Sequence, residues 1–444
     1  MPLKKSLKKY NLAMTLFVLA IFIILTINLI SLDVFRFEEE EVTKIHYADN
    51  ISDTHKKLIE MFNRKYKGEI KVIPIDLPFT KFSTNERKEL LVRSLRGKNK
   101  KIDVFATDQI WIPRFLKWAE PLDKYFEKSE KEEILESAYQ TCINEGKLFS
   151  IPMYMDFGVL FYRKDLIDQF QKGDRIKKQI NNSIRWQDFI DLGEQWNESH
   201  EKNSFFLYLG DNYEGLICNY LEILYSKEGQ YDPKQKGDLL KKKKIRSLKF
   251  LKDLIYEYEL TPQAVKNFKE VDLYRYAMKN DIPFFRGWIS SLKDTSIFGK
   301  YSEKVKFLDY APLPHFDDKH SRYVFGGWNL MISEFSQNKQ EAVKFLKFII
   351  SPEAQKFIYE HAYYMPVLEN FYQKQNILSK KEYKLFSRVI KKYGSHRPSY
   401  ENYTRISNVV SYYINQCLSH KSILPGTSLR KAQKSIESGE IILE

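Results

Sequence analysis

The chain contains 444 residues, of which 43% are hydrophobic and 15% aromatic, and it carries a formal net charge of +14. This length exceeds what one hydrophobic core usually organises, so we expect two packed lobes, with one large domain as the alternative. The three cysteines, Cys142, Cys218 and Cys417, are far apart and form no CxxC pair, which argues against a disulfide framework or a zinc site and indicates buried thiols.

The first 32 residues have the pattern of a signal anchor. Four lysines within residues 1–9 precede an uncharged apolar run from Leu12 to Leu32. That run is long enough to span a bilayer, which requires about 20 residues, and the lysines place the N-terminus in the cytoplasm. No cysteine near the end of the run could accept a lipid, and no Ala-x-Ala-like site is present. We therefore expect an uncleaved transmembrane helix over residues 1–32 rather than a removed signal peptide.

The rest of the chain is then expected at the outer face of the cytoplasmic membrane, periplasmic or extracellular, anchored by residues 12–32. Residues 33–42, which include four consecutive glutamates, form a charged spacer. Residues 1–44 hold six basic and five acidic side chains, so +13 of the net charge lies downstream. An exported protein seldom meets nucleic acid, so we expect no nucleic-acid partner. The four lysines 241–244 are interpreted as a solvated loop.

The exported part has the alternating strand and helix pattern of an α/β protein. Short runs of apolar and β-branched residues predict strands at 43–47, 69–75, 103–106, 159–162 and 305–308. Helices are predicted after Ser52, a residue type favoured as N-cap, after Asn338, where Glu341 can complete a capping box, and after Ser351, with Pro352 in the first turn. The alternation argues for sheets that are covered by helices.

Six segments occur in one order over about 400 residues and together carry a resemblance. They are DVFATDQIWIPRFLKWAEPLDKYF from Asp103, GKLFSIPMYMDFGVLFYRKDLI from Gly146, YEGLICNYLEILYSKEG from Tyr213, PFFRGWISSL from Pro283, FGGWNLMISEFSQNKQEAVKFLKFIISPEAQKFI from Phe325, and Arg397-Pro398. In this order they resemble the family 1 extracellular solute-binding proteins of ABC importers, which include maltose- and trehalose-binding proteins. The GGWN-to-SPEAQ segment is the most specific of the six.

The resemblance implies an α/β, two-lobed periplasmic-binding-protein-like fold with a hinge and a ligand cleft between the lobes. Its implied function is to bind a sugar, an oligosaccharide or glycoside, by lobe closure and to deliver it to the transmembrane subunits of an ABC permease. The expected hinge crossings are Tyr154–Val159, Tyr310–Leu313 and Met365–Asn370. The expected lobes are 43–155 plus 313–365 and 156–312 plus 366–444.

Sugar sites combine flat rings, which stack on apolar sugar faces, with charged groups that bind hydroxyls. The resemblance implies that the rings come from Trp111, Tyr154, Trp288 and Trp328, with Gly327 allowing close backbone approach. It implies that the charged groups come from Asp108, Asp156, Glu214, Arg286 and Arg397. For several of them a structural role is open as well: Asp108 as a helix N-cap, Trp111 in the core, Glu214 at a helix dipole, and both arginines in salt bridges. Around Arg286 the family pattern is broken, because Gly287 replaces an Asn and Ile289 a Pro.

Other functions have weaker support in the sequence. A membrane-anchored glycoside hydrolase or transferase would need two carboxylates flanking a scissile bond, and no catalytic dyad, nucleophile elbow or phosphate loop is recognisable. A sugar sensor or adhesin with the same fold is a further alternative. We expect no cofactor, and no metal at His315, Asp317, Asp318 and His320, which fall where the family has a variable loop. The sequence does not identify the sugar.

Overall fold

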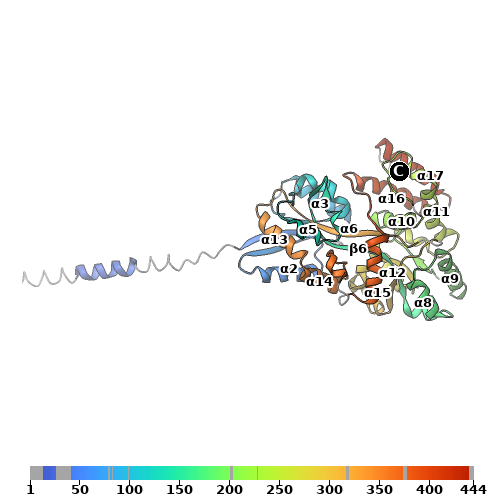
Figure 1. Cartoon of the computed structure of the whole chain (residues 1–444), viewed down its shortest axis with the longest axis horizontal. Helices are drawn as coiled ribbons and strands as arrows, with labels where there is room; N and C mark the ends of the chain where they lie inside the picture. Colours follow the sequence, from blue (N-terminus) through green and yellow to red (C-terminus); the bar gives the residue numbers. More distant parts are fainter. Residues whose placement is uncertain are drawn as a thin grey trace, which may run out of the picture.

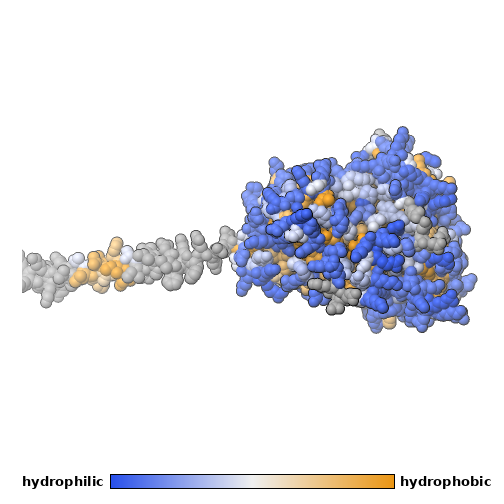
Figure 2. Space-filling model, viewed as in Figure 1, coloured by the Kyte–Doolittle hydropathy of each residue, from blue (hydrophilic) through white to orange (hydrophobic). Residues whose placement is uncertain are grey.

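The structure, a computed structural model, describes residues 14–26 and 42–439, apart from 79–80, 83, 99, 201–203, 228, 317–319 and 374–377. Residues 14–26 are helical, with exposed side chains that are mostly hydrophobic (Figure 2). Within the described part of the chain, no helix is long and apolar enough to cross a membrane. The predicted anchor 1–32 and the spacer 33–42 lie largely outside the described residues.

One nine-stranded sheet organises the remainder of the chain. Its main path runs β2–β1–β3–β10–β6–β8–β7, with β11 on β10 and β9 on β6. The strands are β1 (Thr43–Asp49), β2 (Ile70–Asp76), β3 (Val104–Asp108), β6 (Ile151–Arg163), β7 (Phe206–Leu207), β8 (Phe284–Trp288), β9 (Leu308–Ala311), β10 (Tyr323–Ile332) and β11 (Gly394–Ser395); β4 (Ile143–Asn144) and β5 (Lys147–Leu148) form a separate hairpin. All 13 residues of β6 are buried, as expected for a central strand covered on both faces.

The helices form two groups on either side of the midpoint of β6 (Figure 1). The group around β1–β3 comprises α2 (Asp53–Lys65), α3 (Thr84–Arg96), α4 (Ile112–Phe115), α5 (Lys128–Glu132), α6 (Glu136–Tyr139), α13 (Lys339–Ile349) and α14 (Pro352–Ala362). The group around β7–β9 comprises α7 (Lys164–Ile167), α8 (Gly173–Asn181), α9 (Trp186–Ser199), α10 (Glu214–Ser226), α11 (Lys242–Tyr256), α12 (Glu270–Lys279), α15 (Lys380–Arg388), α16 (Tyr403–Ser419) and α17 (Pro425–Ser438). Each group with its strands forms one lobe.

All three predicted helix starts are confirmed, because α2, α13 and α14 begin directly after Ser52, Asn338 and Ser351. Ser52 caps α2 by accepting from the backbone N–H of His55, and Ser351 caps α14 in the same way from Ala354. The predicted capping box at Asn338 is wrong, because its side chain makes no cap hydrogen bond. The amide of Asn338 instead donates to the carbonyl oxygen of Lys44 at 3.2 Å, since the edge of β1 lies beside the helix start.

Two other local predictions are wrong. Residues 305–307 belong to a 3-10 helical stretch, Thr295–Phe307, and only Leu308 begins a strand, because a four-residue apolar run does not distinguish the two. The tract 241–244 is no solvated loop. Its last three lysines start α11, and Lys244 is buried against Asp238, with 2.6 Å between Nζ and Oδ1.

The buried-thiol prediction is confirmed for all three cysteines. Burial raises the pKa of the Cys142 thiol to about 12 and that of Cys417 to about 11, and it also raises the pKa of Cys218. Because the thiolate is the reactive form, these side chains act as small apolar core residues.

Three chain segments connect the lobes. β6 pairs with β10 through residues 151–157 and with β8 and β9 through 158–163. β10 pairs with β11 at Tyr323 and Val324 and with β3 at 328–332. Met365 exchanges backbone hydrogen bonds with Met155. The carbonyl oxygen of Leu313 accepts from the hydroxyl of Ser183.

Candidate ligand-binding site

The strand register brings six of the ten predicted residues onto one face of the sheet. Trp328 of β10 pairs with Asp108 of β3 on one side and with Tyr154 of β6 on the other. Further along β6, Asp156 pairs with Gly326, and Gly158 pairs with Trp288 of β8. Paired residues and alternate residues of a strand share a face of the sheet. Asp108, Tyr154, Asp156, Arg286, Trp288 and Trp328 therefore lie on the same face, which we call the central row.

At one end of the central row, Trp328 is held by two neighbours. Its ring meets the edge of Trp111 at 5.3 Å, and the guanidinium carbon of Arg87 lies 4.4 Å from its centroid. Trp328 is partly exposed, whereas Trp111 is 1% exposed and packs in the core, as the alternative for that residue anticipated. Gly327 has φ of +146°, and a Cβ there would lie 2.5 Å from the carbonyl oxygen of Tyr154, so only glycine fits beside Trp328.

Sequence reasoning missed two charged residues at this end. Arg87, on α3, forms a buried ion pair with Asp49 at 2.8 Å, and Asp49 also accepts from the Tyr47 hydroxyl. Asp49 ends β1, just as Asp108 ends the neighbouring parallel strand β3. Ligands of α/β sheets bind outside the carboxyl ends of strands, so that position was a signal that could have identified Asp49. Nothing in the helical pattern of α3 marked Arg87.

Arg397 joins Asp108 to Glu214 across the lobes. Its guanidinium donates to Asp108 at 2.8 Å and to Glu214 at 3.1 Å, and its side chain is 3% exposed. Glu214 begins α10 and accepts also from the hydroxyls of Tyr403 and Ser407. Burial raises the pKa of Glu214 against the opposing effect of Arg397. Asp108 also caps the following turn, accepting from the backbone N–H of Ile110 at 3.2 Å, so the N-cap and the salt bridge coexist.

Arg286 and Trp288 form the other end of the central row. Arg286 makes two hydrogen bonds to Glu222, at 2.7 and 3.2 Å, in a pair that is buried throughout. The pair lies over Gly158, where a Cβ would come 2.4 Å from the arginine. The guanidinium carbon also lies 4.0 Å from the ring centroid of Trp288, whose indole N–H donates to Glu270 at 3.2 Å. Arg286 thus positions the partly exposed tryptophan ring.

Asp156 lies between the two tryptophans and lacks a basic partner among the described residues. Its carboxylate accepts from the Ser290 hydroxyl and from the backbone N–H of Phe157. Burial raises the pKa of Asp156 to about 6, although both hydrogen bonds act to lower it. Beside it, Tyr154 stacks on Tyr364 with 3.7 Å between ring centroids. The centre of the row therefore offers a carboxylate acceptor next to flat rings.

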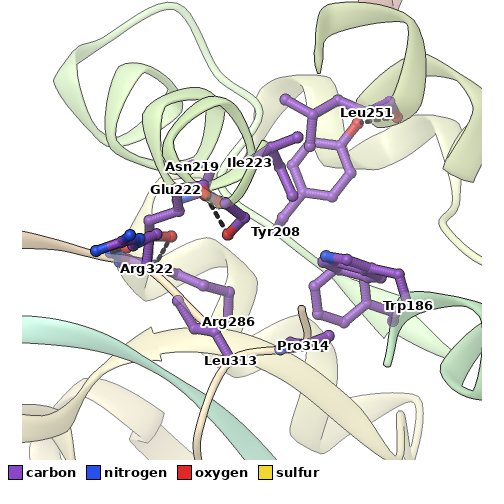
Figure 3. A pocket seen from close by; sticks show the side chains of 12 residues that line it. Trp186, Tyr208, Asn219, Glu222, Ile223, Leu251, Arg286, Leu313, Pro314 and Arg322 are labelled. Carbon is purple, nitrogen blue, oxygen red and sulfur yellow. Dashed lines mark hydrogen bonds and ion pairs between the residues drawn. The ribbon is translucent and has the colours of Figure 1, made fainter. Parts of the chain in front are cut away.

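A pocket lies behind Arg286, inside the lobe that contains α9–α11 (Figure 3). Its walls include Trp186, Tyr208, Glu222 and Leu251, and about 380 Å³ lies free of atoms, part of it open to solvent. Its lining is mostly apolar and includes Arg286 as the one member of the predicted set.

The described residues contain no group of three or more metal-ligating side chains, and Asp317 and Asp318 lie outside them.

Comparison with known proteins identifies the family. The family model for bacterial extracellular solute-binding proteins matches residues 48–356. The chain belongs to this family. A probable ABC transporter-binding protein of Deinococcus radiodurans is 24% identical over 390 residues, which cover 85% of this chain and 88% of that protein.

Solved structures agree with the two-lobed fold. This solute-binding protein matches maltose-bound MalE3 of T. maritima with a TM-score of 0.76 and 25% identity, over 89% of this chain and all of that one. It matches a solute-binding protein of Thermotoga lettingae, bound with α-D-tagatose, with a TM-score of 0.75 and 21% identity, over 89% and 99% of the two chains. The expected α/β fold of two lobes is confirmed.

The raised pKa of Asp156 leads to a prediction on stability. A carboxyl whose pKa rises from 3.8 to about 6 on folding stabilises the fold fully below about pH 4, and this contribution is lost as the pH rises through about 6. Compared with Asp156→Asn, the wild type should therefore lose on the order of 3 kcal/mol of unfolding free energy between pH 4 and pH 7. Urea denaturation at a series of pH values measures the difference. The free energy of unfolding of the control Asp174→Asn, which changes a fully exposed carboxylate, should depend on pH in the same way as that of the wild type. If Asp156 had an ordinary pKa, Asp156→Asn would also show the pH dependence of the wild type, and the prediction would be contradicted.

Proposed function

We propose that this protein is the substrate-binding component of an ABC importer and that it binds a sugar between its lobes. The observation that carries the proposal is the central row, in which the partly exposed Trp288 and Trp328 flank the carboxylate of Asp156. Rings can stack on the apolar faces of a pyranose while a carboxylate accepts from its hydroxyls. The maltose and the α-D-tagatose bound by the two similar proteins support this ligand class.

The proposed site comprises nine of the ten predicted residues, without the core residue Trp111, together with Asp49 and Arg87. Trp288, Trp328 and Tyr154 supply rings, Asp156 and Asp108 accept from hydroxyls, and Arg87 presents its guanidinium beside Trp328. Arg286 and Arg397, with Glu214, hold these groups in place through their ion pairs. We propose lobes close to 43–155 plus 313–365 and 156–312 plus 366–444, with the second boundary moved into β10. No step of catalysis is proposed.

The ligand proposal is tested with the full-length chain, purified in mild detergent, against a panel of mono- and oligosaccharides. A ligand present at 100 times its Kd stabilises the folded state by about 2.7 kcal/mol, so a true ligand should raise the unfolding temperature. Lobe closure around the same ligand should reduce the radius of gyration measured by small-angle scattering with matched-out detergent. A panel that produces no thermal shift, or a saturating ligand that leaves the radius unchanged, would contradict sugar binding or closure respectively.

We further propose that residues 12–32 anchor the protein to the cytoplasmic membrane, with the lobes outside and next to the permease subunits. The helix at residues 14–26 supports this, because its Leu, Ile and Phe side chains are exposed on all sides. The protein should sediment with membranes and, after extraction, have the intact mass of a chain that includes residues 1–32. A soluble product that begins near Asp33 would refute the anchor.

A further inference from the structure

A cluster of basic side chains surrounds Tyr393, on the lobe of α15 and away from the central row. The ring of His320 lies 4.7 Å from that of Tyr393, and the guanidinium carbons of Arg322 and Arg388 lie 5.5 and 5.3 Å from its centroid. The ammonium of Lys392 lies at 5.5 Å. Tyr393 itself is 7% exposed. Four basic side chains therefore lie within 6 Å of one buried aromatic ring.

A pocket opens within this cluster. It has about 360 Å³ free of atoms, part of it open to solvent, and His315, His320, Arg388 and Tyr393 contribute to its wall. Nδ1 of His315 is buried there and has no hydrogen-bond partner in the described part of the chain. Hydroxyls line the same wall: Ser183 and Ser321 hydrogen-bond each other at 2.6 Å. About half of the lining of this pocket is polar, whereas the lining of the pocket behind Arg286 is mostly apolar.

The positive charge around Tyr393 is not neutralised by the described residues. None of Arg322, Arg388 and Lys392 forms an ion pair with a described carboxylate, although many other basic residues of the chain do. The pKa of His320 is lowered, first by desolvation and then by Arg388, Lys392, His315 and Arg322. Like charges held together in this way are stabilised when an anion binds among them. The backbone around Tyr393 is unusual too: Lys392 and Tyr393 belong to a π-helical turn, a feature that is frequent at functional sites.

We propose that this pocket is an anion site for a phosphate group, separate from the sugar site. Arg388 supplies guanidinium donors of the geometry that matches tetrahedral oxyanions, and His315 and His320 supply further N–H donors from the wall of the pocket. Arg322 and Lys392 lie around the same Tyr393 ring and add positive charge beside the pocket. The phosphate comes either as free inorganic phosphate or as the phosphodiester of an anionic cell-envelope polymer. The net charge of +13 downstream of residue 44 favours contact with such a polymer.

The experiment titrates the full-length chain with inorganic phosphate and, in a second arm, with poly(glycerol phosphate), by calorimetry at low ionic strength. Arg388→Ala should weaken phosphate binding about ten-fold, because one charge-assisted contact is lost from an exposed position that the fold does not need. The matched control is Arg430→Ala, which removes one equally exposed charge on α17 and should leave phosphate binding unchanged. Binding in both arms identifies the shared phosphate chemistry, and binding of the polymer alone identifies a phosphodiester site.

Three results would overturn the proposal. One is the absence of binding in both arms, and another is an equal loss in Arg388→Ala and Arg430→Ala, which would indicate a general charge effect. The third is phosphate binding that appears only in an Asp317→Asn, Asp318→Asn double variant, because the chain's own carboxylates would then supply the anion. Sugar binding by Arg388→Ala should equal that of the wild type. This arm separates failure of the anion site from failure of the proposed transport function.

Discussion

Replacing Trp288 or Trp328 with alanine is expected to weaken sugar binding by about 2 kcal/mol or more, roughly thirty-fold in Kd. Both rings are partly exposed on the central row, so each loses contact area with the ligand while little of the core is disturbed. The urea midpoint should therefore change much less than the affinity. Calorimetric titration with the sugar found by thermal shift, combined with urea denaturation, measures both quantities for each variant.

The matched control is Trp196→Ala. Trp196 is 2% exposed and stacks on Phe170, far along the chain from the central row, and truncating such a core tryptophan costs about 3–5 kcal/mol of stability. Once folded, this variant should bind the sugar normally. A Trp288 or Trp328 variant that behaves like Trp196→Ala would show that the ring belongs to the core and not to the site.

Arg397→Ala is expected to destabilise the protein by about 3–5 kcal/mol. The change leaves Asp108 and Glu214 facing each other without their shared cation, and both carboxylates are largely withdrawn from water. Burial raises the pKa of Glu214 and Arg397 opposes that rise, so removing the arginine should raise this pKa further. Equilibrium unfolding in urea at pH 7 gives the free energy.

Restoring charge balance should recover most of this loss. In Arg397→Met with Asp108→Asn and Glu214→Gln, the three charges are removed together while the side-chain volumes stay similar, and such replacements of buried ion pairs are often neutral. Lys128, which pairs with Glu132 while both side chains are exposed, provides the contrast: Lys128→Ala should cost less than about 1 kcal/mol. A loss for Arg397→Ala as small as that of Lys128→Ala would mean that water reaches the three charged groups.

Much of the fold could be predicted from local patterns, because the relevant signals lie close together in sequence. The caps at Ser52 and Ser351 are examples, since the capping side chain and the N–H that it accepts from are three residues apart. Asn338 has the same local pattern, yet its side chain bonds the backbone of Lys44, 294 residues away. Lys244 in turn is buried by Asp238 and the packing of α11. Tertiary contacts of this kind override local preference and have no local signature.

The site, like the fold, was predictable only where its residues lie in short segments that can be recognised in the sequence. The rings and acids of the central row sit at strand positions that motif resemblance locates, and the sheet register then brings them together. The partners of the two arginines, Glu222 for Arg286 and Asp108 with Glu214 for Arg397, lie 64, 289 and 183 residues away. Arg87 meets Trp328 only because α3 folds over β10. Such pairings depend on the folded topology, which the residue pattern alone does not contain.

The pairing of β6 on both sides of its midpoint limits how the two lobes can move. Residues on both sides of Phe157–Gly158 keep their backbone hydrogen bonds, to β10 on one side and to β8 and β9 on the other. A joint that separates there would have to expose buried N–H and C=O groups, which is costly. We therefore expect motion of one lobe against the other to occur as a change in the twist of the sheet, since neighbouring strands are on average twisted by about 20–25°. The resting angle between the lobes would then depend on the side chains that pack across the central row.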